Sequence, residues 1–212
     1  MIRAADGFRV ALTIDAEHPD RPTDVGVTER LIETLAREAV VATFFLQGRW
    51  AEAYPDVART IASAGHLIGN HSHYHARMPL LSDDGLAEDI ADAGRAIEEA
   101  TGVDPHPWFR CPFGAGAADA RVQAAVTAAG YRHVGWHVGV EDWEPARDAP
   151  TIETDVVTGT VACGDGSVVL LHAWPRATLA ALPGTIARLR DAGARFVRID
   201  ELDEMPAAPN WA

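Results

Sequence analysis

The segment 71–75, with the sequence HSHYH, is the part of the chain best suited to binding a metal ion. His71 and His75 are four residues apart, and on one helical turn this spacing would place both imidazoles on the same side. Two imidazoles so placed can share a metal ion and leave room for a carboxylate and a water. A polar loop is the alternative interpretation. A carboxylate from a neighbouring strand end would favour a hydrolytic metal site, where the metal makes bound water acidic and polarises a carbonyl.

Further polar side chains directly follow short apolar runs elsewhere in the chain. A histidine that ends an apolar run is often only a hydrogen-bonded core residue, an arginine there can form a structural ion pair, and an aspartate can belong to a turn. An aspartate can also bond to a histidine and fix its tautomer. The residues in these positions are Asp15, Glu17, His18, Arg110, Asp142 and His172.

Short apolar runs alternate with amphipathic stretches along the whole chain. This pattern predicts an α/β fold of parallel strands joined by crossover helices. Periodicity does not separate a barrel from an open sheet. The absence of a GxGxxG turn after the first strand argues against a dinucleotide-binding fold. In either architecture the polar residues behind the strands gather at one end of the sheet. Strands are predicted at 9–15, 41–46, 66–69, 107–110, 131–138, 168–172 and 195–199, and helices at 24–38, 50–63, 83–100, 118–129, 152–161 and 179–191.

The composition excludes several classes of partner. The net charge of -13 and the lack of a basic run disfavour nucleic acid and anionic membranes, whereas a neutral substrate or a cationic amine product is tolerated. The cysteines, Cys111 and Cys163, are too few for a cysteine-based zinc site and are expected to be buried, reduced thiols. Neither a signal-peptide pattern nor an apolar run of membrane-spanning length is present, so a cytoplasmic protein is predicted, although a trimmed secreted chain would look the same.

Five short motifs in order resemble those of the polysaccharide deacetylases, also called NodB-homology or carbohydrate esterase family 4 proteins. Each motif alone is unspecific, but five in this order are hard to obtain by chance. The resemblance extends from about Val10 to Leu202. The motifs are 13–16 (TIDA, for Thr-Phe-Asp-Asp), 71–75 (HSHYH), 110–114 (RCPFG), 142–143 (DW) and 170–172 (LLH).

The resemblance implies a distorted (β/α) barrel with about seven parallel strands, forming a single catalytic domain over residues 1–212. Asp15 would be the general base for the attacking water, and Arg110 would pair with it and favour its charged form. His172 would protonate the leaving amine, with Asp142 orienting it. Both a base and an acid are needed because an amide nitrogen leaves poorly unless protonated.

Metal and substrate residues are implied in the same way. His71 and His75 would bind a divalent metal, expected to be zinc, with cobalt, nickel or manganese as alternatives. Phe113 of the third motif would contact the substrate. Trp143 and Trp174 would line the acyl or sugar pocket, unless they are simply core residues.

The chain departs from the family pattern at Ala16, where the family has its third metal ligand. Alanine cannot bind a metal, and two neutral histidines alone make a poor zinc site. Glu17 is the expected substitute, because residues two apart on a strand point the same way and Asp15 and Glu17 would then both face the pocket. Asp15 itself, or less favourably His18, are the other candidates, and loss of the metal is a further alternative. A second departure is Gly139, where relatives often carry an aspartate.

The expected function is therefore metal-dependent hydrolysis of an amide C–N bond, most simply N-deacetylation of an N-acetylated amino sugar or its polymer. Hydrolysis of a small non-sugar amide or cyclic imide by the same residues is an alternative. A carbohydrate-binding domain that lost catalysis through Ala16 is a second one, but such a domain would not need Asp15 and His172 as a base and an acid.

Overall fold

The computed structural model describes residues 7–20 and 26–204. The described residues form two compact units. The first unit contains residues 7–14, 26–43 and 136–204, and the second contains residues 15–20 and 44–135. The prediction of one catalytic domain over 1–212 stays a prediction.

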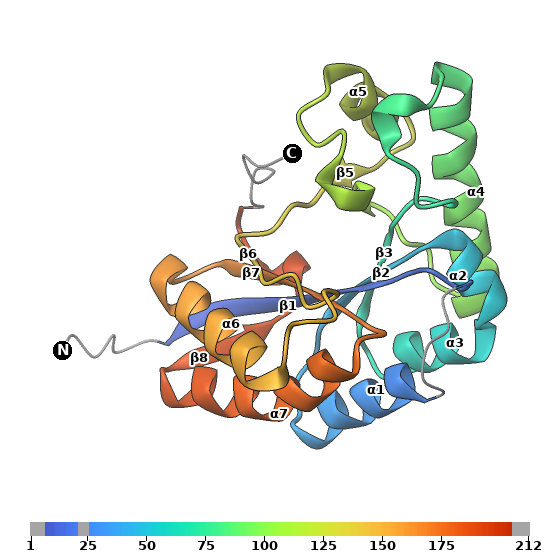
Figure 1. Ribbon diagram of the computed structural model, residues 1–212. Coiled ribbons are helices and arrows are strands. Elements are labelled where there is room, and N and C mark those ends of the chain that lie inside the picture. Colours follow the sequence, from blue (N-terminus) through green and yellow to red (C-terminus); the bar gives the residue numbers. More distant parts are fainter. Residues whose placement is uncertain (1–6, 21–25, 205–212) are drawn as a thin grey trace. The chain divides into compact units, whose positions relative to one another are not determined.

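Strand β1 (Phe8–Ala16) is the central strand of the first unit. The strand order there is β8-β1-β7-β6, and the pairs β1–β8 and β6–β7 are parallel. Helix α7 packs against both α1 and α6 (Figure 1). The elements are β6 (Val138–Gly139), β7 (Ser167–His172), β8 (Ala194–Val197), α1 (Val27–Arg37), α6 (Ala149–Cys163), α7 (Arg176–Asp191) and the 3-10 turn η3 (Ile199–Glu201).

The last residues of β1 belong to the second unit, where the strand order continues as β2-β3-β4-β5. The pairs β3–β4 and β4–β5 are parallel, and α4 packs against α2, α3 and α5. The elements are β2 (Thr43–Leu46), β3 (Leu67–Asn70), β4 (Trp108–Phe109), β5 (Arg132–His133), α2 (Gly48–Ala53), α3 (Pro55–Ser63), α4 (Asp83–Thr101), α5 (Ala120–Ala128) and the 3-10 turns η1 (Met78–Leu80) and η2 (Pro112–Gly114).

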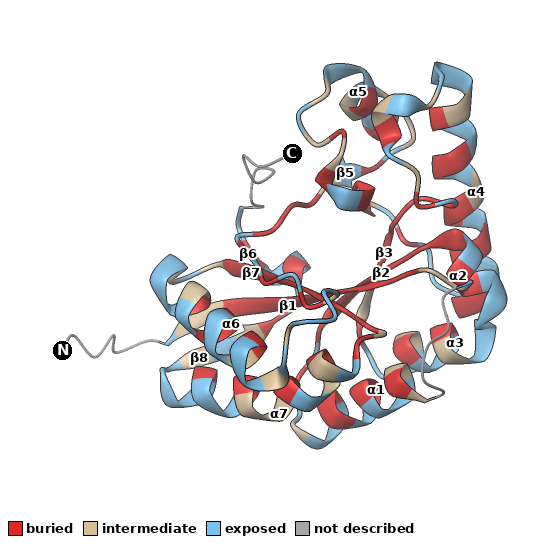
Figure 2. Ribbon diagram, viewed as in Figure 1, coloured by how far each residue is buried: buried red, intermediate tan, exposed pale blue. Residues whose placement is uncertain are grey.

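The central strands of each unit are buried, and the helices expose one face. Figure 2 shows β1, β2 and β7 buried over most of their length, while α4, α6 and α7 alternate between buried and exposed residues. Strands buried on both faces are typical of parallel sheets covered by helices. The predicted α/β class with parallel strands is confirmed.

Two predicted elements are each divided in the structure. The helix predicted at 50–63 is two helices, because Tyr54 leaves the helical region at φ -130° before Pro55, and a residue that precedes proline disfavours the α conformation. The strand predicted at 131–138 is the two short strands β5 and β6. Between them the carbonyls of Val134 and Gly135 accept hydrogen bonds from the Arg110 side chain.

Three smaller predictions concern a helix start, the two thiols and the membrane. The helix predicted at 24–38 begins at Val27, and its first predicted residues, 24 and 25, lie outside the described residues. Cys111 is a buried free thiol as expected, but Cys163 is exposed, at the solvent-facing end of α6, so the prediction that both are buried was wrong. Within the described ranges, no helix is both long and apolar enough to cross a bilayer.

Candidate active site

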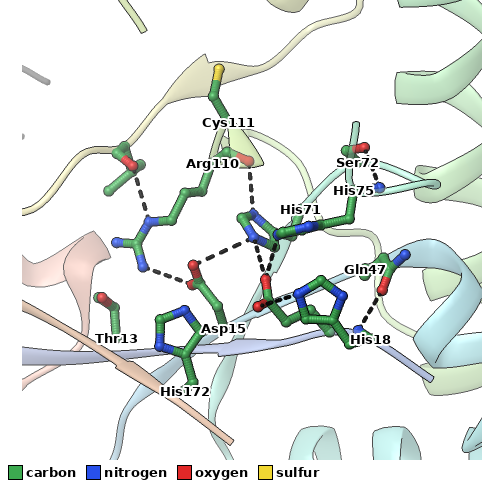
Figure 3. A network of polar contacts seen from close by, with 12 residues as sticks. Thr13, Asp15, His18, Gln47, His71, Ser72, His75, Arg110, Cys111 and His172 are labelled. Atoms are coloured by element: carbon green, nitrogen blue, oxygen red, sulfur yellow. Dashed lines mark hydrogen bonds and ion pairs between the residues drawn. The ribbon is translucent and has the colours of Figure 1, made fainter. Parts of the chain in front are cut away.

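The carboxyl end of β1 carries a buried ion pair in the second unit. The Arg110 guanidinium donates from Nη1 to Oδ1 of Asp15 at 2.8 Å (Figure 3). Arg110 is 0% exposed and Asp15 is 3% exposed, so water screens this pair very little. The predicted pairing of Arg110 with Asp15 is thus present.

The other two nitrogens of Arg110 also donate hydrogen bonds. Its Nε donates to the carbonyl of Val134 at 3.2 Å, its Nη2 donates to the carbonyl of Gly135 at 3.1 Å, and its guanidinium lies 4.1 Å from the ring centroid of Phe45. Burial lowers the pKa of Arg110, and the Asp15 carboxylate opposes that shift. These contacts hold the guanidinium in one orientation and so determine where the Asp15 carboxylate lies.

The histidine segment that follows β3 is not a helical turn, which corrects the geometry expected for His71 and His75. The segment is an irregular loop in which Ser72 and His75 have positive φ values of 67° and 56°. The two imidazoles are nevertheless neighbours, with ring centroids 5.0 Å apart. Their spacing in the sequence indicated the right pair, but a loop rather than a helix brings them together.

Buried polar side chains hold this loop in place. The Asn70 side chain accepts a hydrogen bond from the Ser72 amide at 2.8 Å, and the Ser72 hydroxyl accepts one from the His75 amide at 3.1 Å. The Asp89 carboxylate of α4 accepts from the amides of His73 and Tyr74 at 3.2 and 3.0 Å. Backbone groups that no regular element satisfies therefore find side-chain partners.

Glu17 lies at the centre of the histidine cluster. Its Oε2 is 3.2 Å from Nε2 of His71 and 2.5 Å from Nε2 of His75, and its Oε1 is 3.0 Å from Nε2 of His18. Asp15 reaches the same cluster, since its Oδ2 is 3.4 Å from Nε2 of His71. The two carboxylates thus face the same imidazole, as their spacing of two residues predicted.

The electrostatics of the cluster suit a bound cation. Burial acts to lower the pKa of His71, but the charge of Asp15 and the hydrogen bond with Glu17 outweigh it and raise that pKa. Burial lowers the pKa of His75, opposed by Glu17, which favours the neutral imidazole that a metal requires. The carboxylates of Asp15 and Glu17 are both buried, and the Arg110 guanidinium pairs with Asp15, which leaves Glu17 facing the imidazoles.

The donor atoms also fit a metal ion. Nδ1 of His71 is 2.9 Å from the carbonyl of Arg110, which can only accept, so Nδ1 carries a proton, and Nε2, which faces Glu17, is the nitrogen that would bind a metal. Ligands about 2.0–2.1 Å from a tetrahedral zinc are roughly 3.3 Å apart, which matches the 3.2 Å between His71 and Glu17, whereas the 2.5 Å between His75 and Glu17 is shorter. Glu17, His71 and His75 therefore form a suitable ligand set without Ala16.

Cys111, which lies in the same region, is excluded as a catalytic nucleophile by its burial. Cys111 lies between Arg110 and Pro112, and burial raises the pKa of its thiol to about 12, although a hydrogen bond from Gln123 opposes the shift. A thiol with that pKa has almost no thiolate near neutral pH.

The predicted acid and its partner lie together in the first unit. Nδ1 of His172 is 2.7 Å from Oδ1 of Asp142, whose Oδ2 accepts from the His172 amide at 2.8 Å and from the Thr178 hydroxyl at 2.5 Å. Asp142 is 2% exposed. An ionised carboxylate only accepts hydrogen bonds, so it holds the His172 proton on Nδ1 and leaves Nε2 to exchange a proton.

The three predicted substrate residues are aromatic rings beside these groups. Trp143 and Trp174 are partly exposed and lie on His172, with ring centroids 4.9 and 6.3 Å from it. In the second unit, Phe113 is 50% exposed, lies 4.4 Å from the His75 ring and has a positive φ of 59°. Exposure of these rings leaves surface for a substrate to contact.

Sequence reasoning did not identify three residues that position the site. Gln47 and Asp89 hold the loops that carry the histidines, and Thr178 bonds to Asp142. Asp89 could have been noticed in the sequence, because it lies next to Ile90 on the buried side of α4, where a charged residue is unusual. Gln47 and Thr178 are ordinary polar residues whose role depends on tertiary contacts.

The sequence profile of the polysaccharide deacetylase family matches residues 3–134, which contain the first three motifs. The peptidoglycan-N-acetylglucosamine deacetylase PgdA of Listeria monocytogenes is 32% identical over 94% of this chain and 40% of its own length. The chain belongs to the polysaccharide deacetylase family. It spans about two fifths of the length of that relative.

Solved structures agree with this assignment. A family 4 carbohydrate esterase from Streptomyces lividans, in complex with acetate, is 30% identical and superposes with a TM-score of 0.81 over 97% of this chain and 100% of its own. A mutant of BA3943 from Bacillus anthracis, described as a CE4 family pseudoenzyme with restored enzymatic activity, is 29% identical, with a TM-score of 0.82 over 94% of this chain and 68% of its own. These matches confirm the predicted (β/α) fold.

Proposed function

We propose that this chain is a metal-dependent N-deacetylase that removes acetyl groups from N-acetylglucosamine units of an oligosaccharide or polysaccharide. The observation that carries the proposal is the buried cluster in which the Asp15 carboxylate, paired with Arg110, lies 3.4 Å from His71, whose Nε2 also meets Glu17. The relative named as a peptidoglycan-N-acetylglucosamine deacetylase supports the choice of substrate.

Glu17, His71 and His75 would hold a divalent metal, with zinc proposed and cobalt, nickel or manganese as alternatives. When bound, the metal would polarise the acetyl carbonyl and make the attacking water more acidic. In this proposal the substitution at Ala16 moves the carboxylate ligand by one residue, to Glu17, and the site is retained.

The residues of the chain divide the proton transfers between them. Asp15 accepts the proton of the attacking water at Oδ2, because its Oδ1 is occupied by Arg110. His172 donates a proton from Nε2 to the amide nitrogen as the C–N bond breaks, and Asp142 holds its Nδ1 proton in place. Phe113, Trp143 and Trp174 contact the sugar or its acetyl group.

The test is release of acetate from an N-acetylglucosamine oligomer, measured beside the metal content of the same preparation. The parent chain should contain about one metal ion per chain and lose activity to a chelator. Asp15→Asn should lower kcat by roughly 10²–10⁴. The exposed residue Asp84 supplies a matched control, and Asp84→Asn should leave kcat unchanged.

Three results would contradict the proposal in different ways. Activity on a small amide or cyclic imide, with none on the sugar oligomer, would replace the substrate. A metal-loaded chain that binds the oligomer but releases no acetate would indicate a carbohydrate-binding domain. Unchanged metal content in Glu17→Ala would move the third ligand to Asp15 or His18.

A further inference from the structure

His18 is the third imidazole next to Glu17, and neither the family motifs nor the proposed ligand set includes it. One ligand atom from each of Glu17, His18 and His75 lies within 4.8 Å of the other two. Nε2 of His18 is 3.0 Å from Oε1 of Glu17, while His71 and His75 contact Oε2 of the same carboxylate. Three imidazoles thus surround one glutamate.

The orientation of His18 is held by its surroundings. Its ring packs edge-on against His75, with centroids 4.5 Å apart. Its amide donates to Oε1 of Gln47 at 2.8 Å (Figure 3). Nε2 of Gln47 donates in turn to the carbonyl of His73 at 3.2 Å. The buried Gln47 side chain therefore joins the His18 turn to the histidine loop after β3.

The backbone at His18 is in a conformation that costs free energy. Its φ is 60°, in the left-handed region, which residues other than glycine adopt uncommonly and in which asparagine, aspartate and histidine are enriched. The side chain is 25% exposed, whereas that of Glu17 is 5% exposed. A ring held at the open side of a buried carboxylate is well placed to meet a cation there.

We infer that His18 is a fourth protein ligand of the metal, which would be bound by three imidazoles and one carboxylate. This inference rests on the proposed function, since it concerns the same metal. Four protein ligands complete a tetrahedral shell, and a hydrolytic site must keep a position open. The bound metal must therefore accept at least five ligands, which zinc, cobalt, nickel and manganese can all do.

The alternative role for His18 is to bond to Glu17 from outside the metal's ligand shell. Affinity alone cannot separate the two roles, because loss of such an outer partner already weakens metal binding by about 10–100-fold. The visible absorption of bound Co²⁺ does separate them, since it responds to the number and type of atoms bonded directly to the ion.

The experiment is titration of the metal-free full chain with Co²⁺, followed by its visible spectrum and by competition with a chromophoric chelator. His18→Asn is the variant of choice, because asparagine tolerates the left-handed conformation while its shorter amide removes the imidazole. His106→Asn is the control, since the His106 side chain is 43% exposed and bonds to Asp104. Circular dichroism should show that every variant is folded.

We expect His18→Asn to weaken Co²⁺ binding by at least about 100-fold and to change the spectrum, with His106→Asn unchanged. Weaker binding with an unchanged spectrum would overturn the inference and assign His18 to Glu17 alone. An unchanged affinity and spectrum, with binding lost in Glu17→Ala, would overturn it while the proposed function stands. No Co²⁺ binding by the parent chain would overturn both.

Discussion

Replacement of Arg110 by methionine tests whether the buried ion pair at the end of β1 is as closely coupled as its geometry indicates. The change removes the guanidinium that pairs with Asp15 and takes the side-chain donors away from the carbonyls of Val134 and Gly135. Loss of one partner of a buried pair costs about 3–5 kcal/mol. Each carbonyl left without a partner adds to that cost, so we expect Arg110→Met to lower the free energy of unfolding by at least about 3 kcal/mol.

The contribution of the unpaired charge is isolated by a second substitution. In the double variant Asp15→Asn/Arg110→Met a neutral amide replaces the carboxylate, so no unpaired charge is buried. The double variant should therefore be more stable than Arg110→Met by about 2 kcal/mol. Urea unfolding with a chelator present measures both differences free of any metal contribution.

Arg121 offers a matched control because it also contacts a carboxylate and two carbonyls, those of Asp83, Leu81 and Pro79, but its side chain is 39% exposed. Arg121→Met should cost no more than about 1 kcal/mol. If the double variant were no more stable than Arg110→Met, the cost would come from packing and the lost carbonyl bonds, and the argument from a buried unpaired charge would be wrong.

Three further predictions concern acid stability, close packing and the proposed acid. Burial lowers the pKa of His133 from 6.5 to about 4, with Arg110 and His71 acting in the same direction, so unfolding takes up a proton between these values and stability is lost as pH falls through that range. Relative to His133→Asn, the parent chain should lose up to about 3 kcal/mol of its free energy of unfolding between pH 6.5 and 4. Urea unfolding midpoints that change equally with pH in the two proteins would contradict this. A Cβ at Gly48 would lie 2.4 Å from Nδ1 of His73 and 2.9 Å from Cα of Ala93, so Gly48→Ala should cost about 1–3 kcal/mol in thermal unfolding, and a neutral effect would show that α2 can shift. Asp142→Asn should lower kcat by roughly 10²–10⁴ at unchanged metal content, because the carboxylate that holds the Nδ1 proton of His172 is lost; near-normal turnover would show that His172 does not need this carboxylate.

The chemistry-bearing residues were largely identifiable from the sequence alone, because their types and spacing are local properties. The pairing of Arg110 with Asp15 and of Asp142 with His172 was expected and is present. Glu17 was expected to compensate for Ala16, and it reaches both His71 and His75. Their roles in metal binding and catalysis stay proposals.

Element boundaries were less predictable wherever a tertiary contact competes with local preference. The strand expected at 131–138 is interrupted where the carbonyls of Val134 and Gly135 bond to Arg110, a residue more than 20 positions earlier. Periodicity in a short window cannot report a partner so distant in the sequence. The division of the helix at Pro55, by contrast, follows from a local rule that the apolar pattern had obscured.

The sequence by itself determined the α/β class, the family and which side chains could carry acid–base and metal chemistry, since each depends on residue type and order. Only the tertiary structure decided how those side chains converge. It placed His71 and His75 on a loop with left-handed residues, brought Gln47 and Asp89 under that loop, and turned His18 toward Glu17. These arrangements depend on distances between residues far apart in the chain, and such distances exist only after the strands and helices have packed.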